Sequence, residues 1–172
     1  MRRWLLVGIG VVAAAALAVV AIGLALPRAH VAAASRTVTG APGAVWATVV
    51  DFERYPTWHP DVVRVEREAV AGRETWRETY RGGETVRYET TEADPPRRLV
   101  RTIADPDGPF RGRWEIRLEP AEGGTRVTIT ERGEVPNPVF RFVARFVIGH
   151  RAFMERFLDA LARKHGTPPV AA

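Results

Sequence analysis

Residues 137–164 carry apolar side chains at helical spacing, and this pattern constrains the fold more than any other in the chain. The stripe consists of Val139, Val143, Phe146, Phe153, Phe157 and Leu161, which is typical of one face of an α-helix. Asn137 is a good N-cap residue ahead of Pro138, and Gly166 follows a basic last turn. We predict one continuous helix of about 40 Å, longer than a small domain needs to cover its core.

Six segments upstream show the alternation and the bounding turns of β-strands. In the clearest of them Trp114, Ile116 and Leu118 alternate with charged residues, which is typical of a half-buried antiparallel strand. The predicted strands cover residues 62–69, 74–81, 84–92, 98–104, 110–119 and 125–133, after a short first strand at 36–40. Turn residues recur about every ten residues without intervening helical patterns, which indicates a meander and not βαβ units.

The sheet and the helix each need an apolar face covered, and each can cover the other. The predicted fold class is therefore α+β, a helix-grip arrangement in which a curved antiparallel sheet of about seven strands surrounds a long C-terminal helix. Two short helical segments fall between the first and second strands, within residues 42–55. One helix cannot fill the concave side of so wide a sheet, so we expect a cavity that binds apolar ligands.

Residues 4–26 are free of charge and almost entirely apolar. As a helix they would span about 34 Å, enough to cross the hydrocarbon core of a bilayer. Arg2 and Arg3 precede the segment and Trp4 occupies an interfacial position, which favours a single-pass anchor with the domain outside the cytoplasm. A cleaved signal peptide is the alternative, because the small residues 32–34 offer cleavage sites. We favour the uncleaved anchor.

The predicted organisation follows from these segments. An N-terminal transmembrane anchor or signal peptide occupies residues 1–27, an Ala-rich linker residues 28–35, one folded domain residues 36–166, and a disordered tail residues 167–172.

The composition argues against several classes of chemistry. The chain has no Cys, a single Ser at Ser35 and a single Lys at Lys164, which disfavours thiol, Ser–His–Asp and Schiff-base catalysis. The four His lack metal-ligand spacing and no phosphate-binding motif is present, so we predict no metal and no cofactor. The net charge of +5 arises from Arg interleaved with Glu. This pattern indicates a solvated face and a GC-rich genome, and we expect no nucleic-acid partner.

A few polar and aromatic residues fall in phase with the predicted inner face. Glu131 continues the phase of Val127 and Ile129, and a buried carboxylate is costly unless it is paired. We expect its partner to be an Arg or Tyr on a neighbouring strand, or His150. The candidate ligand-binding residues are Trp58, His59, Trp76, Tyr80, Tyr88, Trp114, Glu131, Phe146, His150 and Phe153. For each of them an ordinary core, rim or turn position remains open.

Two runs carry a family resemblance. The sequence APGAVW at residues 41–46, followed by DFERYPTWHP at 51–60, resembles the START/Bet v 1-like superfamily, which includes polyketide cyclase/dehydrase and lipid transport proteins. The end of the last helix, LDALARK, is similar to the C-terminal helix of that family. The resemblance covers residues 35–165 and implies a helix-grip fold. It does not imply one function, because the superfamily includes lipid carriers, hormone receptors, quinone-binding proteins and cyclases. The N-terminal anchor departs from its commonest single-domain members.

Three functions are compatible with these observations, and we assign no catalytic residue. The preferred one is a membrane-tethered domain that binds or transfers a hydrophobic small molecule such as a lipid or quinone. The second is a cyclase/aromatase-type enzyme that uses acid–base groups among Tyr80, Glu131, His59 and His150. The third is an envelope interaction module with a filled core. Glu131 within hydrogen-bond reach of His150 would favour the enzyme. A dry apolar pocket would favour the carrier, and a filled core without a pocket would favour the interaction module.

Overall fold

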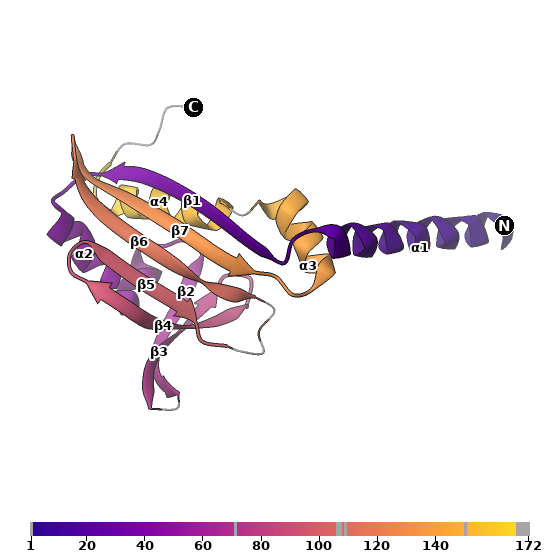
Figure 1. Cartoon of the computed structure of the whole chain (residues 1–172), viewed down its shortest axis with the longest axis horizontal. Coiled ribbons are helices and arrows are strands. Elements are labelled where there is room, and N and C mark those ends of the chain that lie inside the picture. Colours follow the sequence, from indigo (N-terminus) through magenta and orange to yellow (C-terminus); the bar gives the residue numbers. More distant parts are fainter. Residues whose placement is uncertain (1, 71, 106–107, 109, 150, 168–172) are drawn as a thin grey trace.

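The computed structural model describes residues 2–70, 72–105, 108, 110–149 and 151–167 (Figure 1). The strands are β1 (Ala29–Val38), β2 (Val62–Val70), β3 (Arg73–Tyr80), β4 (Thr85–Asp94), β5 (Arg98–Ile103), β6 (Arg111–Ala121) and β7 (Gly124–Glu134). The helical segments are α1 (Arg2–Ala25), α2 (Pro42–Val50), η1 (Phe52–Thr57), α3 (Pro138–Val143), η2 (Ala144–Ile148) and α4 (Ala152–Lys164).

The strands form a single antiparallel sheet in the order β1-β7-β6-β5-β4-β3-β2. Strands β2 to β7 follow one another as the predicted meander, and β1 completes the sheet by pairing with β7. Helices α2 and α4 share one core with the inner face of the sheet, where Val45 and Leu161 pack with Ile116 and Val127. The predicted α+β class, with a curved seven-stranded sheet and a C-terminal helix, is confirmed.

Strand β1 begins earlier than we predicted. Ala29 to Val38 pair without interruption with Glu134 to Thr125 of β7. Residues 29–35 of the predicted linker therefore lie within a strand, and residues 36–38 of the predicted strand at 36–40 are the end of that strand. Ala has a low strand propensity, and the local sequence therefore reads as a linker. The pairing with β7 and the burial of Ala34, which is 4% exposed, override that preference.

The predicted continuous C-terminal helix is interrupted. Asn137 caps α3 as expected, and its side chain accepts hydrogen bonds from the backbone N–H groups of Val139 and Phe140 at 2.9 and 3.2 Å. After the π-helical turn η2, Gly149 adopts φ +79°, a left-handed conformation that ends the helix at little cost for glycine. Within the apolar stripe, Val139, Phe146 and Phe153 are 40%, 59% and 46% exposed, whereas Phe157 and Leu161 further along α4 are buried.

Helix α1 extends away from the sheet, and its C-terminal end lies beside α3 (Figure 1). Residues Val7–Ala25 have a mean hydropathy of 2.6 and are long and apolar enough to cross a membrane, a test that a signal sequence also passes. Gly23 is buried against α3, where an added Cβ would collide with the carbonyl oxygen of Pro138. Arg141 Nη1 donates to the Leu26 carbonyl at 2.7 Å. The end of α1 is thus packed against the domain.

The predicted tail begins in an ordered contact. The Thr39 backbone N–H donates to the Thr167 hydroxyl at 2.9 Å. The rest of the predicted tail, residues 168–172, lies outside the described residues.

Candidate functional site: a buried charge pair on the inner face

Strands β3, β4 and β5 place four polar side chains side by side on the inner face of the sheet. Glu78 and Arg101 are 3% and 7% exposed, and Arg101 Nη1 donates to Glu78 Oε1 at 2.6 Å. The Tyr80 hydroxyl donates to Glu78 Oε2 at 2.9 Å and lies 3.2 Å from the Tyr88 hydroxyl. We call Glu78, Tyr80, Tyr88 and Arg101 the Glu78–Arg101 cluster.

Arg101 lies between aromatic rings and has N–H groups that are not used in hydrogen bonds. Its guanidinium carbon lies 4.1 Å from the ring centroid of Phe52 and 4.7 Å from that of Tyr88. Two of its nitrogens, Nε and Nη2, are buried and form no hydrogen bond of good geometry among the described residues, and the Tyr55 hydroxyl is the nearby group that interacts with the guanidinium. A guanidinium has five N–H donors, and a buried donor without an acceptor is costly. The cluster can therefore accept a ligand that presents an oxygen acceptor to Arg101.

The two tyrosines and Arg101 of this cluster each have pKa values far above neutral pH. Burial raises the pKa of Tyr80 and of Tyr88 well above the usual range, so both hydroxyls stay protonated at neutral pH. Burial by itself would lower the pKa of Arg101, but the adjacent Glu78 carboxylate, together with Tyr55 and Tyr88, more than offsets burial and raises that pKa. Arg101 therefore stays charged and is paired with Glu78. The cluster offers hydrogen-bond donors, and its protonated tyrosines are poorly suited to take up a proton.

A second polar group lies where β1 begins and β7 ends, close to α1 and α3 (Figure 1). Trp114 Nε1 donates to Glu131 Oε2 at 2.8 Å, and His30 Nε2 lies 2.9 Å from Glu131 Oε1. The side chains of His30 and Glu131 are 16% and 21% exposed. Gly133 leaves room for the His30 ring, because an added Cβ would collide with it. We call His30, Trp114 and Glu131 the Glu131 cluster.

Aromatic side chains fill much of the space where we expected a cavity. Phe157 of α4 packs with its ring centroid 5.4 Å from Trp58, 5.6 Å from His59, 5.8 Å from Tyr55 and 6.0 Å from Trp114. His59 is buried, its Nδ1 accepts from the Asp61 backbone N–H at 3.2 Å, and burial lowers its pKa against the opposing effect of Asp61. The neutral imidazole therefore carries its proton on Nε2.

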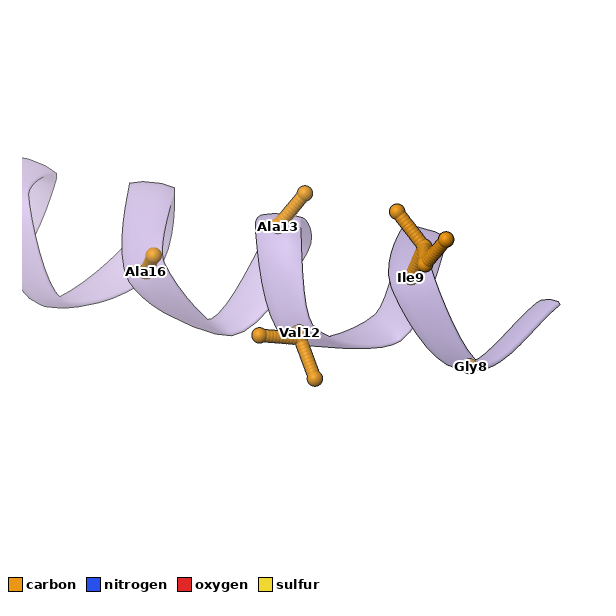
Figure 2. A pocket seen from close by; sticks show the side chains of 5 residues that line it. All are labelled: Gly8, Ile9, Val12, Ala13 and Ala16. Atoms are coloured by element: carbon orange, nitrogen blue, oxygen red, sulfur yellow. The ribbon is translucent and has the colours of Figure 1, made fainter. Parts of the chain in front are cut away.

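Two hollows on the described part of the chain lie outside this inner face. One is a shallow apolar dip along α1, shown in Figure 2, formed by Gly8, Ile9, Val12, Ala13 and Ala16. The other is on β2 to β5, lined by Glu68, Ala69, Val70, Arg77, Arg87, Ala104 and Asp105. A cavity between the sheet and α4 is not one of these two. The inner site is thus defined by its polar groups and aromatic packing.

The predicted site residues lie in different parts of the structure. Tyr80 and Tyr88 belong to the Glu78–Arg101 cluster, Trp114 and Glu131 to the Glu131 cluster, and Trp58 and His59 surround Phe157. Trp76 packs against Phe52 with a ring separation of 5.3 Å, beside the first of these clusters. Phe146 and Phe153 are 59% and 46% exposed and lie outside the buried core. His150 lies outside the described residues, so its expected pairing with Glu131 stays a prediction.

Sequence reasoning missed Glu78, Arg101 and His30. Glu78 lies between Trp76 and Tyr80, two residues from each, and so shares their face of β3. Arg101 stands in the same relation to Leu99 and Ile103 on β5. A charged residue in the apolar phase of two nearby strands is a usable signal for a buried pair. His30 gave no such signal, because its segment did not resemble a strand.

The fold is that of the START/Bet v 1-like helix-grip domains, as the resemblance predicted. A family profile described as polyketide cyclase / dehydrase and lipid transport matches residues 29–166. The chain therefore belongs to this family. The matched region begins at the first residue of β1, in agreement with the early start of that strand.

Solved structures share this fold at low sequence identity. A START superfamily protein from Mycobacterium smegmatis is 17% identical with a TM-score of 0.63, and the alignment covers 80% of this chain and 97% of that one. The Zhui aromatase/cyclase from Streptomyces sp. R1128 is 17% identical with a TM-score of 0.64, covering 80% and 94%. The di-domain ARO/CYC StfQ from the steffimycin biosynthetic pathway is 14% identical with a TM-score of 0.64, covering 80% of this chain and about half, 51%, of StfQ. A search of curated proteins gave no significant match.

Proposed function

We propose that this chain is a membrane-anchored domain that binds or transfers a hydrophobic small molecule, such as a lipid or quinone, carrying an oxygen acceptor. The observation that carries the proposal is Arg101, a buried cation between aromatic rings with two N–H nitrogens that lack a partner among the described residues. An apolar surround with a few placed donors is the usual composition of small-molecule sites. A carbonyl, phenol or phosphate oxygen would satisfy these donors.

Binding is better supported than acid–base catalysis. Both oxygens of Glu78 are engaged, one by Arg101 and one by Tyr80, and the two tyrosines have raised pKa values. Protonation of Glu78 would remove the charge that pairs with Arg101, and a tyrosine with a raised pKa is already protonated and cannot act as a general base near neutral pH. Two similar structures are aromatase/cyclases, but these features of the inner face favour recognition over proton transfer.

The contacts of α1 support an uncleaved anchor. Cleavage after Ala34, at the predicted small-residue sites, would remove residues 29–34, which are six of the ten residues of β1. It would also remove His30 from the Glu131 cluster and Leu26 from its hydrogen bond with Arg141. Retaining the segment preserves all three. With Arg2 and Arg3 ahead of the span, we place the domain outside the cytoplasm.

The packing around Phe157 favours a second candidate, an interaction module of the cell envelope. Four aromatic residues surround this ring, so a ligand reaches Arg101 only if Phe157 or the segment before it moves. A module with a permanently filled core needs no such movement. The two candidates therefore differ in whether a small molecule is retained.

Mass spectrometry of what co-purifies with residues 28–172 tests the proposal. The fragment of residues 28–172 contains all of β1 and is prepared without detergent. The matched variants are Arg101→Lys, which can keep the charge pair with Glu78 but places no donor at the positions of Nε and Nη2, and Glu131→Gln as a control in the other cluster.

We expect a stoichiometric hydrophobic ligand in the wild-type protein and in Glu131→Gln, and its loss in Arg101→Lys. Retention in Arg101→Lys with loss in Glu131→Gln would move the recognition site to the Glu131 cluster. A stable protein that remains empty when offered lipid and quinone extracts would favour the interaction module.

A further inference from the structure

The segment between the sheet and α4 presents an apolar surface to solvent. Val139 and Phe140 of α3 are 40% and 43% exposed, and Phe146 and Val147 of η2 are 59% and 71% exposed. Phe110, 44% exposed at the start of β6, adds its ring at 5.8 Å from that of Phe140. We call these five residues the α3–η2 patch. Exposed apolar groups gathered in this way mark an interaction surface.

The charged residues within this segment are all basic. Between Glu134 and Glu155 the sequence contains three Arg and one His and no acidic residue, and Arg141 is the buried one of the three Arg. Arg145 is exposed, with its guanidinium carbon 6.0 Å from the Phe146 ring centroid, and Arg151 is exposed on the far side of Gly149, where its Nε lies 3.2 Å from Glu155 Oε1. Basic residues beside exposed aromatic and aliphatic groups are typical of segments that lie in the headgroup region of a bilayer.

The position of the patch identifies the bilayer concerned. Pro138, the first residue of α3, packs on Gly23, which is two residues before the end of the apolar span Val7–Ala25. Arg141 bonds to the carbonyl of Leu26, the residue just after that span. At about 1.5 Å per residue, α3 therefore lies within one helical turn of the point where α1 would leave the hydrocarbon core.

We propose that the α3–η2 patch is a second membrane contact, which lies in the headgroup region of the same bilayer that α1 crosses. The inference rests on the membrane anchoring given under the proposed function. Its occupant is a lipid surface containing anionic phospholipid, which fits both the apolar side chains and the flanking Arg residues. The patch and α1 together would hold the domain in one orientation against the membrane.

This orientation gives the broken helix a role. Gly149, at φ +79°, separates the patch from α4, which carries Phe157 into the aromatic cluster. A hydrophobic molecule leaving the bilayer at the patch would meet this break before it meets the Glu78–Arg101 cluster. Contact with the membrane would therefore supply the ligand without passage through water.

Depth-resolved fluorescence quenching tests the proposal in the full chain. The protein has no Cys, so a single Cys labelled with an environment-sensitive fluorophore reports one position. The labelled variants are Val147→Cys in the patch, Leu17→Cys within α1, and Val70→Cys on β2 as an exposed apolar control. Each is reconstituted into vesicles of phosphatidylcholine and phosphatidylglycerol that carry a nitroxide near the headgroup or near the end of the acyl chain.

We expect the label at Val147 to be blue-shifted and quenched more by the shallow nitroxide, the label at Leu17 more by the deep one, and the label at Val70 by neither. Quenching at Leu17 without quenching at Val147 would overturn the second contact and leave the anchor intact. Absence of quenching at both would overturn the anchor and this inference together. A blue shift at Val147 without lipid quenching would show that protein covers the patch, and would also overturn the proposal.

Discussion

The Glu78–Arg101 cluster and the Glu131 cluster both place a carboxylate on the inner face, but only the first keeps donors in reserve. Glu131 receives Trp114 and His30 at hydrogen-bond distance and retains some access to solvent. Glu78 is sealed from solvent and paired with a cation that has two nitrogens without partners in the described part of the chain. In the function that we propose, burial and unused donors together, and not the presence of a carboxylate, make Arg101 the candidate recognition group.

The comparison also explains why each cluster tolerates its charge. Desolvation of a charged pair is offset only by close geometry and further hydrogen bonds. The Glu78–Arg101 cluster meets this requirement with a 2.6 Å ion pair, a tyrosine hydroxyl and two flanking rings. The charge of Glu131 is stabilised partly by water, so removing this charge should lower the free energy of unfolding by a smaller amount.

The largest effect should come from breaking the sealed pair. Arg101→Met leaves the Glu78 carboxylate buried without its cation, and we expect the free energy of unfolding to fall by about 3–5 kcal/mol. Urea denaturation of residues 28–172 measures the change. The double variant Glu78→Gln/Arg101→Met is the matched control and should recover much of the loss. A loss below about 1 kcal/mol, as for exposed ion pairs, would mean that the pair is solvated.

Overfilling the Glu131 cluster should cost less. Gly133→Ala places a methyl group against the His30 ring and displaces it from Glu131, and we expect a loss of about 1–3 kcal/mol. Gly43→Ala in α2 is the control, since an added Cβ there meets nothing within 4 Å and should be neutral or slightly stabilising. Equal behaviour of the two variants in urea would show that the His30 ring moves aside without penalty.

Removing the charge of Glu131 should cost less again. The side-chain amide oxygen introduced by Glu131→Gln can still accept from Trp114 Nε1, so we expect a loss of about 0.5–1.5 kcal/mol in the free energy of unfolding. Trp114→Phe in the Glu131→Gln background gives the coupling between the two residues by a double-mutant cycle. A loss as large as that of Arg101→Met would remove the distinction between the clusters.

Acidification should produce the smallest change. Burial lowers the pKa of His59, so as pH falls below about 6.5 the unfolded chain binds a proton that the folded chain does not. The free energy of unfolding should therefore fall with falling pH, and less steeply in His59→Gln. His165→Gln should lessen the slope in the same direction, because burial also lowers the pKa of His165. Urea denaturation at about pH 7.5 and about pH 5.5 measures both slopes. An unchanged slope in His59→Gln would contradict the assignment of a neutral His59.

Much of the fold was accessible from local pattern. Alternation in β6 correctly placed Ile116 and Leu118 in the core, and the cap at Asn137 correctly placed the start of α3. The interruption at Gly149 was not predicted, because residues on both sides continue the same helical spacing. Spacing indicates which residues share a face, but it does not show whether anything covers that face.

The candidate site was accessible only in part. Tyr80, Tyr88 and Glu131 were selected for their phase on the strands, and that phase is local information. Their partners could not be predicted from local pattern, because Glu78 pairs with Arg101 at a separation of 23 residues and His30 pairs with Glu131 at a separation of 101 residues. Partners of this kind depend on strand order, and strand order follows from the assembly of the whole sheet.

The sequence by itself determined strands β2 to β7, the apolar N-terminal helix and the helix-grip class, because these depend on periodicity and turn chemistry within short windows. It indicated the family separately, through the resemblance of the runs at residues 41–60 and of the end of the last helix. The tertiary structure decided which charges are paired and sealed, which half of the C-terminal stripe is buried, and where α1 meets α3. The physical reason is that burial and pairing depend on contacts between distant segments. A residue such as Arg101 acquires its character only when β3, β4 and η1 close around it.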